Sequence, residues 1–141
     1  MSTRSIRLTA LASGMAFLAV AFAIRAFSGG QLLSNDPLQQ YSGSALYASA
    51  MYAWVVLVWP RIAAPLAGII ALGTCWALEF AQLTGVPAAL SARSMVARLA
   101  FGVAFDWTDV LWYPVGVVPL VAVHWFLRAR TIPVRAAASA D

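Results

Sequence analysis

Three carboxylates and a tyrosine stand close to the ends of apolar segments, where side chains with this chemistry need a reason to be present. Glu79 lies near the end of a long apolar run, and Gln82 follows on the same helical face three residues later. Asp106, Asp109 and Tyr113 stand at the start of another apolar run. Carboxylates and tyrosines carry general acid–base chemistry, although no nucleophile–base pair accompanies them. A carboxylate at the edge of a membrane also requires a partner.

The segment between these two groups predicts an amphipathic helix with two arginines. Residues 91–100 read "SARSMVARLA", in which Ser91 is a plausible N-cap. Arg93 and Arg98 flank the polar side, and either arginine is expected to pair with Glu79 or to contact an anionic headgroup. The apolar stripe has helical spacing and consists of Ala92, Met95, Val96 and Leu99. We predict an interfacial helix that roofs the carboxylates, with a re-entrant or loop segment as the alternative.

The same residues have structural interpretations. Asp106 or Thr108 suits the N-cap of a helix, and Asp109 suits its first turn. Glu79 paired with an arginine would fix the helices to one another. Tyr113 suits the aromatic belt at a membrane interface.

Composition places these residues in a membrane protein. The chain has 141 residues, of which 62% are hydrophobic and 10% charged, with a mean hydropathy of +0.82. A soluble domain carries about 25% charged residues. The basic residues are scattered, which argues against a nucleic-acid partner. The single cysteine and single histidine lie far apart, so no metal site is expected, and no cofactor motif is present.

Four apolar segments are long enough, or nearly so, to cross a bilayer, which needs about 20 apolar residues. They cover residues 6–24, 44–59, 62–83 and 108–127. The predicted fold is all-α, with four transmembrane helices and a short interfacial helix between the third and fourth. Residues 1–130 form one domain, and residues 131–141 are predicted to be a disordered cytoplasmic tail. The first segment is interpreted as a retained span, with a signal peptide ending near Ala21–Ala23 as the alternative.

The arginines indicate the orientation of the chain. The side that carries both termini and the 60–61 turn holds six arginines, and the other side holds three. The positive-inside rule therefore predicts cytoplasmic termini in a bacterial inner membrane, with loops 25–43 and 84–107 outside. The six are Arg4, Arg7, Arg61, Arg128, Arg130 and Arg135, and the three are Arg25, Arg93 and Arg98.

Five short motifs, in this order, resemble the DUF2809 family of small bacterial membrane proteins over residues 30–128. They are "GSALYA" at 43–48, "LEFAQ" at 78–82, "LSAR" at 90–93, "LAFGVAFDWTD" at 99–109 and "YPVG" at 113–116. The E-x-x-Q, Arg and Asp pattern is also similar to the wider VanZ-like group. The resemblance implies a four-helix bundle in the inner membrane and no established activity. It carries over Gly43, Glu79, Gln82, Arg93, Gly102, Phe105, Asp109, Tyr113 and Gly116.

Two residues depart from the family pattern. Ser44 stands where the family usually has Asp, and Tyr47 where it has Trp. If that Asp is a reactive carboxylate in other members, its absence weakens a catalytic interpretation here.

Two functions remain open. The first is a non-catalytic membrane protein that binds a lipid headgroup, an envelope precursor or a partner subunit through an outer-leaflet polar cluster. The second is a small lipid-modifying or hydrolytic enzyme that uses Glu79 and Asp109. An enzyme needs both carboxylates to face one accessible space, whereas a structural cluster is closed and charge-paired. A transporter is disfavoured, since four spans without an inverted repeat supply little pathway.

Overall fold

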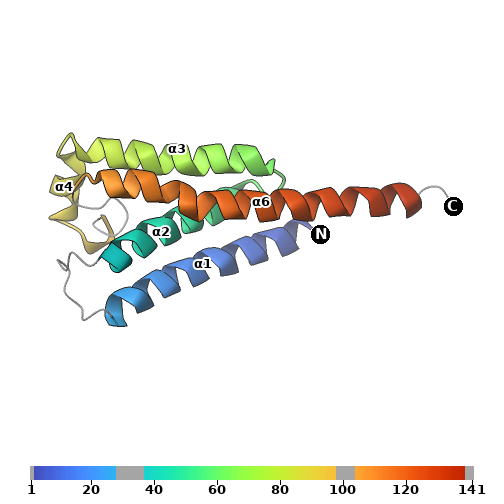
Figure 1. Ribbon diagram of the computed structural model, residues 1–141, viewed down its shortest axis with the longest axis horizontal. Helices are drawn as coiled ribbons and strands as arrows, with labels where there is room; N and C mark the ends of the chain where they lie inside the picture. Colours follow the sequence, from blue (N-terminus) through green and yellow to red (C-terminus); the bar gives the residue numbers. More distant parts are fainter. Residues whose placement is uncertain (1, 28–36, 98–103, 139–141) are drawn as a thin grey trace.

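The computed structural model of the protein describes residues 2–27, 37–97 and 104–138, and every regular element in these ranges is a helix (Figure 1). The helices are α1 (Thr3–Phe27), α2 (Pro37–Val58), α3 (Ala64–Gln82), α4 (Val86–Ser91) and α6 (Trp107–Ala138), and residues 95–97 are also helical. Four stretches are long and apolar enough to cross a membrane: Thr3–Ile24, Gln40–Val58, Ala64–Gln82 and Trp107–Arg130. The predicted number of spans is therefore confirmed.

Two helices are longer than their sequences indicated. α2 begins at Pro37 rather than at residue 44, because proline is well suited to the first turn of a helix and the polar residues after it continue that helix. α6 continues beyond residue 127 to Ala138. This helix ends in alanines, which favour the helix. A disordered tail at 131–141 stays a prediction. The remaining residues, 139–141, lie outside the described part.

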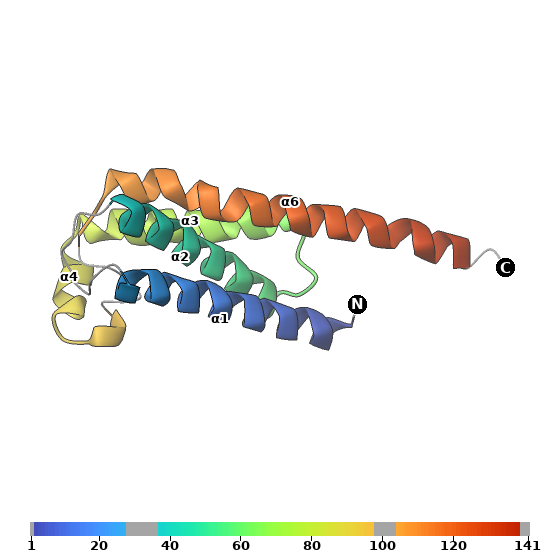
Figure 2. The same ribbon diagram turned by 60° about the horizontal axis from the view of Figure 1, so that its bottom comes forward.

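The bundle is organised around α2, which packs against α1, α3 and α6. Within the described residues α1 contacts α2 alone among the helices, while α3 packs against both α2 and α6. The N-terminus, the α2–α3 turn and the C-terminal half of α6 lie toward one end, which we call the terminal end (Figures 1 and 2). The other end carries α4 and the start of α6, and we call it the α4 end.

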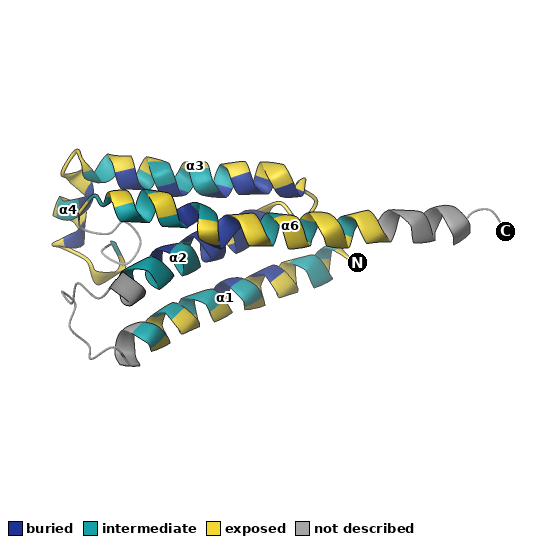
Figure 3. Cartoon of the chain, viewed as in Figure 1, coloured by how far each residue is buried: buried dark blue, intermediate teal, exposed yellow. Residues whose placement is uncertain are grey.

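Small side chains allow these helices to approach closely. Ala48, Ala67, Ala71 and Cys75 are fully buried, and the buried faces turn toward the interior while exposed residues cover the outside (Figure 3). The closest approach joins α2 and α6 at Gly116, where an added Cβ would lie 1.9 Å from the carbonyl oxygen of Ala45. Ser49 Oγ donates to the Gly116 carbonyl oxygen at 3.0 Å across the same contact. Close packing of small residues is the usual way for helices to associate in lipid.

The α2–α3 turn is tied to the last helix. Arg128 on α6 donates hydrogen bonds to the carbonyl oxygens of Pro60, at 3.0 Å, and Arg61, at 3.1 Å. From the sequence, Arg128 is only a topology signal. In the structure it also bonds two carbonyl oxygens of the turn that accept no hydrogen bond within a helix.

Candidate functional site

Glu79 lies on the inner face of α3 at the α4 end, and only 1% of its surface is exposed. It follows Cys75 by one helical turn on the buried stripe of α3. Its Oε1 accepts a hydrogen bond from the backbone N–H of Asp106 at 2.8 Å. Its Oε2 accepts one from the hydroxyl of Tyr113 at 2.6 Å. The carboxylate thus faces the bundle, as expected, and holds the start of α6 against the end of α3.

The ion pair predicted between Glu79 and Arg93 is absent. Arg93 is exposed in the turn after α4, and both oxygens of Glu79 are bonded to the N–H and O–H donors just described. The other predicted partner, Arg98, lies outside the described residues. A buried carboxylate can be satisfied by neutral donors, so no guanidinium is needed to explain its position.

The segment predicted as an interfacial helix at 91–100 is organised differently. α4, Val86–Ser91, ends where the predicted helix begins, so Ser91 closes a helix instead of capping one, and its side chain is buried. A separate helical stretch occupies residues 95–97, and Ser94 Oγ accepts the Ala97 N–H at 3.3 Å at its start. Gly85, with a φ of 75°, turns the chain out of α3, and a proline in the first turn starts α4 there. The apolar pair Met95 and Val96 is 79% and 75% exposed, so it does not cover the carboxylates. Residues 98–100 lie outside the described part.

Asp106, one of the two caps that the sequence allows, is the N-cap of α6. Its Oδ1 accepts the backbone N–H of Thr108 at 2.7 Å, and its Oδ2 accepts a hydrogen bond from the side-chain amide of Gln40. The Thr108 N–H, followed by the smaller effects of the Thr108 and Gln40 side chains, lowers the pKa of the Asp106 carboxyl against a weaker opposing effect of burial. Asp106 therefore joins α2 to the N-terminus of α6 as a carboxylate.

Asp109 makes the second link between α2 and α6. Its Oδ1 accepts a hydrogen bond from the hydroxyl of Ser44. That hydroxyl also lies 2.9 Å from the carbonyl oxygen of Gln40, so one proton is shared between two acceptors. Asp109 and Tyr113 are one turn apart on α6, which places the partners of Ser44 and Glu79 on the same face.

Sequence reasoning missed Gln40 and did not assign Ser44 to the site. The polar stretch before Ser44 is typical of a loop, in which Gln40 and Ser44 have no i, i+4 relationship. A helix beginning at Pro37 would have revealed it, because both side chains then share one face. Gln82, which was expected in the site, is half-buried at the last residue of α3.

We call the set Gln40, Ser44, Glu79, Asp106, Asp109 and Tyr113 the polar cluster. Aromatic rings flank it. Phe105 lies 5.7 Å from Phe80 and 5.1 Å from Trp107, ring centre to ring centre. On α2 and α6, Tyr41 stacks on Trp112 at 4.8 Å. Trp107 is 66% exposed, so aromatic surface extends from the polar cluster to the outside of the bundle.

The polar cluster is rich in acceptors and poor in cations. Within the described residues its carboxylates receive N–H and O–H donors, and neither Glu79, Asp106 nor Asp109 forms an ion pair. Among those residues, no three His, Cys, Asp or Glu side chains gather in a way that would hold a metal ion. The arrangement suits the binding of a positively charged group at the half-buried acids.

These features define an α-helical membrane protein with four candidate spans and a hydrogen-bonded polar cluster at one end. A family model described as "Protein of unknown function (DUF2809)" matches residues 33–117, more than half of the chain. The chain belongs to the DUF2809 family. The match covers α2, α3, α4 and the first part of α6, and it includes every residue of the polar cluster. No solved structure matches this chain.

Proposed function

We propose that the protein is a non-catalytic membrane protein that binds a lipid by its cationic headgroup, at the half-buried acids of the polar cluster. The proposal includes a bacterial inner membrane, cytoplasmic termini, an α4 end at the outer leaflet and a place in the VanZ-like group. An envelope precursor that carries an amine is a ligand of the same class.

The observation that carries the proposal is the uncompensated charge of this cluster. Asp106 and Asp109 are half-buried where the fourth span begins, at Trp107, and no arginine of the described residues pairs with them. An ammonium group supplies the missing positive charge and up to three N–H donors. The exposed ring of Trp107 adds a surface over which a cation is favoured.

Glu79 has a supporting role in this proposal. With 1% of its surface exposed and both oxygens hydrogen-bonded, it offers nothing to a ligand. Its bonds to Asp106 and Tyr113 instead fix the backbone that presents Asp106 and Asp109. The polar cluster therefore offers the half-buried acids Asp106 and Asp109 to a ligand, while Glu79 is enclosed beneath them.

The enzymatic alternative requires Glu79 and Asp109 to face one accessible space. The Ser44–Asp109 hydrogen bond supports it, since a hydroxyl beside a carboxylate is a feature of nucleophilic catalysis. The enclosure of Glu79 argues against it, because a general base must reach its substrate within hydrogen-bond distance. We therefore place binding first.

Native mass spectrometry of the protein released from lipid nanodiscs tests the proposal. The parent should retain phosphatidylethanolamine through delipidation. Asp109→Asn, whose amide oxygen still accepts from Ser44, should reduce phosphatidylethanolamine retention roughly tenfold, the loss expected for one interaction with a charged group. Asp106→Asn should act in the same direction. Asp141→Asn removes the same charge far along the chain and serves as the matched control.

Three results would decide against lipid binding at this place. Retention of phosphatidylethanolamine that is unchanged in both Asp106→Asn and Asp109→Asn removes these acids as the binding site. A lipid recovered with its headgroup cleaved, and intact after incubation with Asp109→Asn, would establish the enzyme instead. A stoichiometric second protein in the parent spectrum that disappears in Asp109→Asn would establish a partner subunit.

A further inference from the structure

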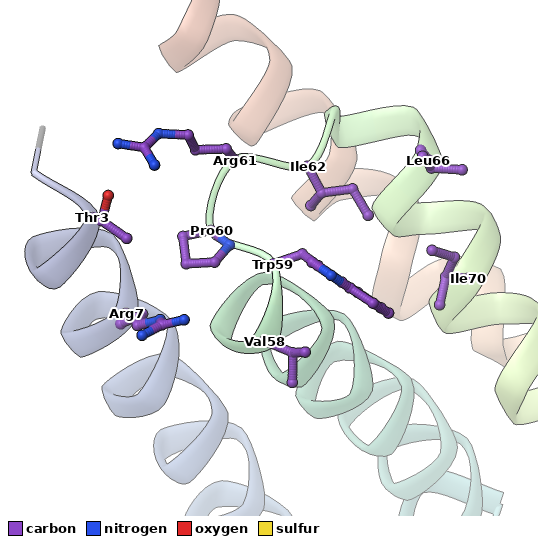
Figure 4. A pocket seen from close by; sticks show the side chains of 9 residues that line it. All are labelled: Thr3, Arg7, Val58, Trp59, Pro60, Arg61, Ile62, Leu66 and Ile70. Atoms are coloured by element: carbon purple, nitrogen blue, oxygen red, sulfur yellow. The ribbon is translucent and has the colours of Figure 1, made fainter.

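The terminal end contains a hollow of about 590 Å³ that the polar cluster does not reach (Figure 4). It lies between α1, the α2–α3 turn and the start of α3. The side chains that matter for its chemistry are Thr3, Arg7, Trp59, Arg61, Leu66 and Ile70. They come from three separate elements, so the bundle must be folded for the hollow to exist.

One side of the hollow is cationic. Arg7 belongs to α1 and Arg61 to the turn, and Figure 4 shows both side chains extending along the space that separates these elements. Both residues are exposed, and neither guanidinium has a carboxylate partner within the described part of the chain. Two planar guanidinium groups from opposite walls suit an anion with several oxygens, above all a phosphate.

The other side of the hollow is apolar. Trp59 is 57% exposed and Leu66 is 50% exposed, and Ile70 follows Leu66 one turn further along α3. The hollow also lies at a membrane boundary, because the first span begins at Thr3, the second ends at Val58 and the third begins at Ala64. A ligand here meets cations at headgroup level and apolar side chains along the acyl region.

We propose that this hollow binds one anionic phospholipid, with its phosphate between Arg7 and Arg61 and an acyl chain along Leu66 and Ile70. Basic pockets between transmembrane helices at headgroup level recognise anionic lipids by this combination. The site is distinct from the polar cluster in position and in charge. Arg7 also lies outside the family-matched residues 33–117.

Arg128 is a positioning residue for this site. Its bonds to the carbonyl oxygens of Pro60 and Arg61 fix the backbone of the turn, and this restricts where the Arg61 side chain can reach. Arg128→Gln should weaken anionic lipid binding and leave the charge of Arg7 and Arg61 in place. Arg128→Lys, with one point charge in place of a two-donor fork, should restore binding only in part.

The chain provides a matched control for unspecific attraction. Arg4 is exposed on α1 three residues before Arg7, and it does not line the hollow. General attraction of the membrane surface depends on net charge, so it would treat Arg4 and Arg7 alike. A specific site in the hollow would depend on Arg7 and not on Arg4.

The experiment is native mass spectrometry of the full chain from nanodiscs that contain phosphatidylglycerol and phosphatidylcholine. We expect the parent to keep one phosphatidylglycerol through delipidation, and Arg7→Gln and Arg61→Gln each to reduce its occupancy roughly tenfold. Arg4→Gln should change it less than about twofold, as surface charge alone would. Melting temperatures of all variants identify any that fail to fold, and Arg61→Lys then replaces Arg61→Gln, with a smaller expected loss.

Three outcomes overturn the proposal. An equal loss in Arg4→Gln reduces the effect to surface charge. Equal retention of phosphatidylcholine removes the requirement for an anion. Displacement of the lipid by soluble glycerol phosphate, without loss of stability, assigns the hollow to a soluble phosphate compound. None of these outcomes affects the test on Asp109, because that test follows phosphatidylethanolamine.

Discussion

Tyr113 on α6 donates a hydrogen bond of 2.6 Å to Glu79 on α3, and both side chains are buried where the two helices meet at the α4 end. The bond joins residues 34 positions apart. The second oxygen of Glu79 holds the backbone N–H of Asp106, so one side chain fixes both the start of α6 and its first turn. The stability of this end should therefore depend on Glu79 more than on any exposed charge near it.

Glu79→Ala should lower the free energy of unfolding by about 2–5 kcal/mol, because it leaves a cavity and two buried donors without an acceptor. Glu79→Gln should cost less, since its amide oxygen still accepts one of the two bonds. Unfolding in mixed micelles measures both. If the two variants are as stable as the parent, the bonds to Tyr113 and Asp106 do not contribute to the free energy of unfolding.

A double-mutant cycle isolates the bond itself. Glu79→Gln and Tyr113→Phe should be coupled by about 0.5–3 kcal/mol, as expected for residues in direct contact. Glu79→Gln combined with Tyr41→Phe is the control, because Tyr41 lies at the same end and stacks on Trp112. That pair should be additive.

Gly116→Ala should prevent the normal packing of α2 against α6. The new Cβ would lie 1.9 Å from the Ala45 carbonyl oxygen, and backbone cannot yield to it as a flexible side chain could. Gly73→Ala is the control, since nothing lies within 4 Å of its Cβ position on α3. It should be neutral or stabilising by up to about 1 kcal/mol, because alanine favours the helix. Equal melting temperatures for both variants would contradict the close approach.

Asp106 should contribute stability that depends on pH. Donation from Thr108 lowers its pKa in the folded state below the unfolded value of about 3.9. Its contribution is therefore fully present above that unfolded value and is lost as the pH falls through the folded pKa. The stability difference between the parent and Asp106→Asn should shrink between neutral pH and about pH 3. Asp141→Asn, with the same change in charge, should show no such trend, and a difference that grows on acidification would reverse the assignment.

The orientation of the bundle can be tested with two exposed positions at opposite ends. In a Cys75→Ser background, Ala89→Cys on α4 should react with an impermeant thiol reagent on intact cells. Ala63→Cys in the α2–α3 turn should react only after the membrane is opened. The reverse pattern would place the termini outside.

The sequence predicted the spans and most of the polar cluster, because apolar length and the position of acids are local signals. It could not predict the partners of Glu79. The backbone N–H of Asp106 and the hydroxyl of Tyr113 satisfy that carboxylate. Every residue except proline has a backbone N–H, so the sequence does not single out this donor, whereas an arginine is an obvious candidate partner. Gln40 was missed for a related reason, since polar residues before a span are typical of a loop and also occur in the extension of a helix.

The predicted helix at 91–100 shows a different limit. Its apolar stripe is regular, and Ser91 is a good cap, yet Gly85 and Pro87 start a helix earlier and Ser91 becomes its end. The predicted start at Ser91 is therefore wrong, and residues 95–97 are helical after a break at residues 92–94. Periodicity alone does not reveal such a break, because it ignores where the preceding helix must stop.

The bonds from Arg128 to the α2–α3 turn also bear on the order in which the molecule is assembled. The ribosome makes the second and third spans before the fourth. The α2–α3 hairpin therefore enters the bilayer before Arg128 has been synthesised. Until α6 arrives, the carbonyl oxygens of Pro60 and Arg61 must be hydrated, and the turn has to remain near the water. The guanidinium of Arg128 then bonds both carbonyl oxygens, so the turn is secured only when all four spans are present.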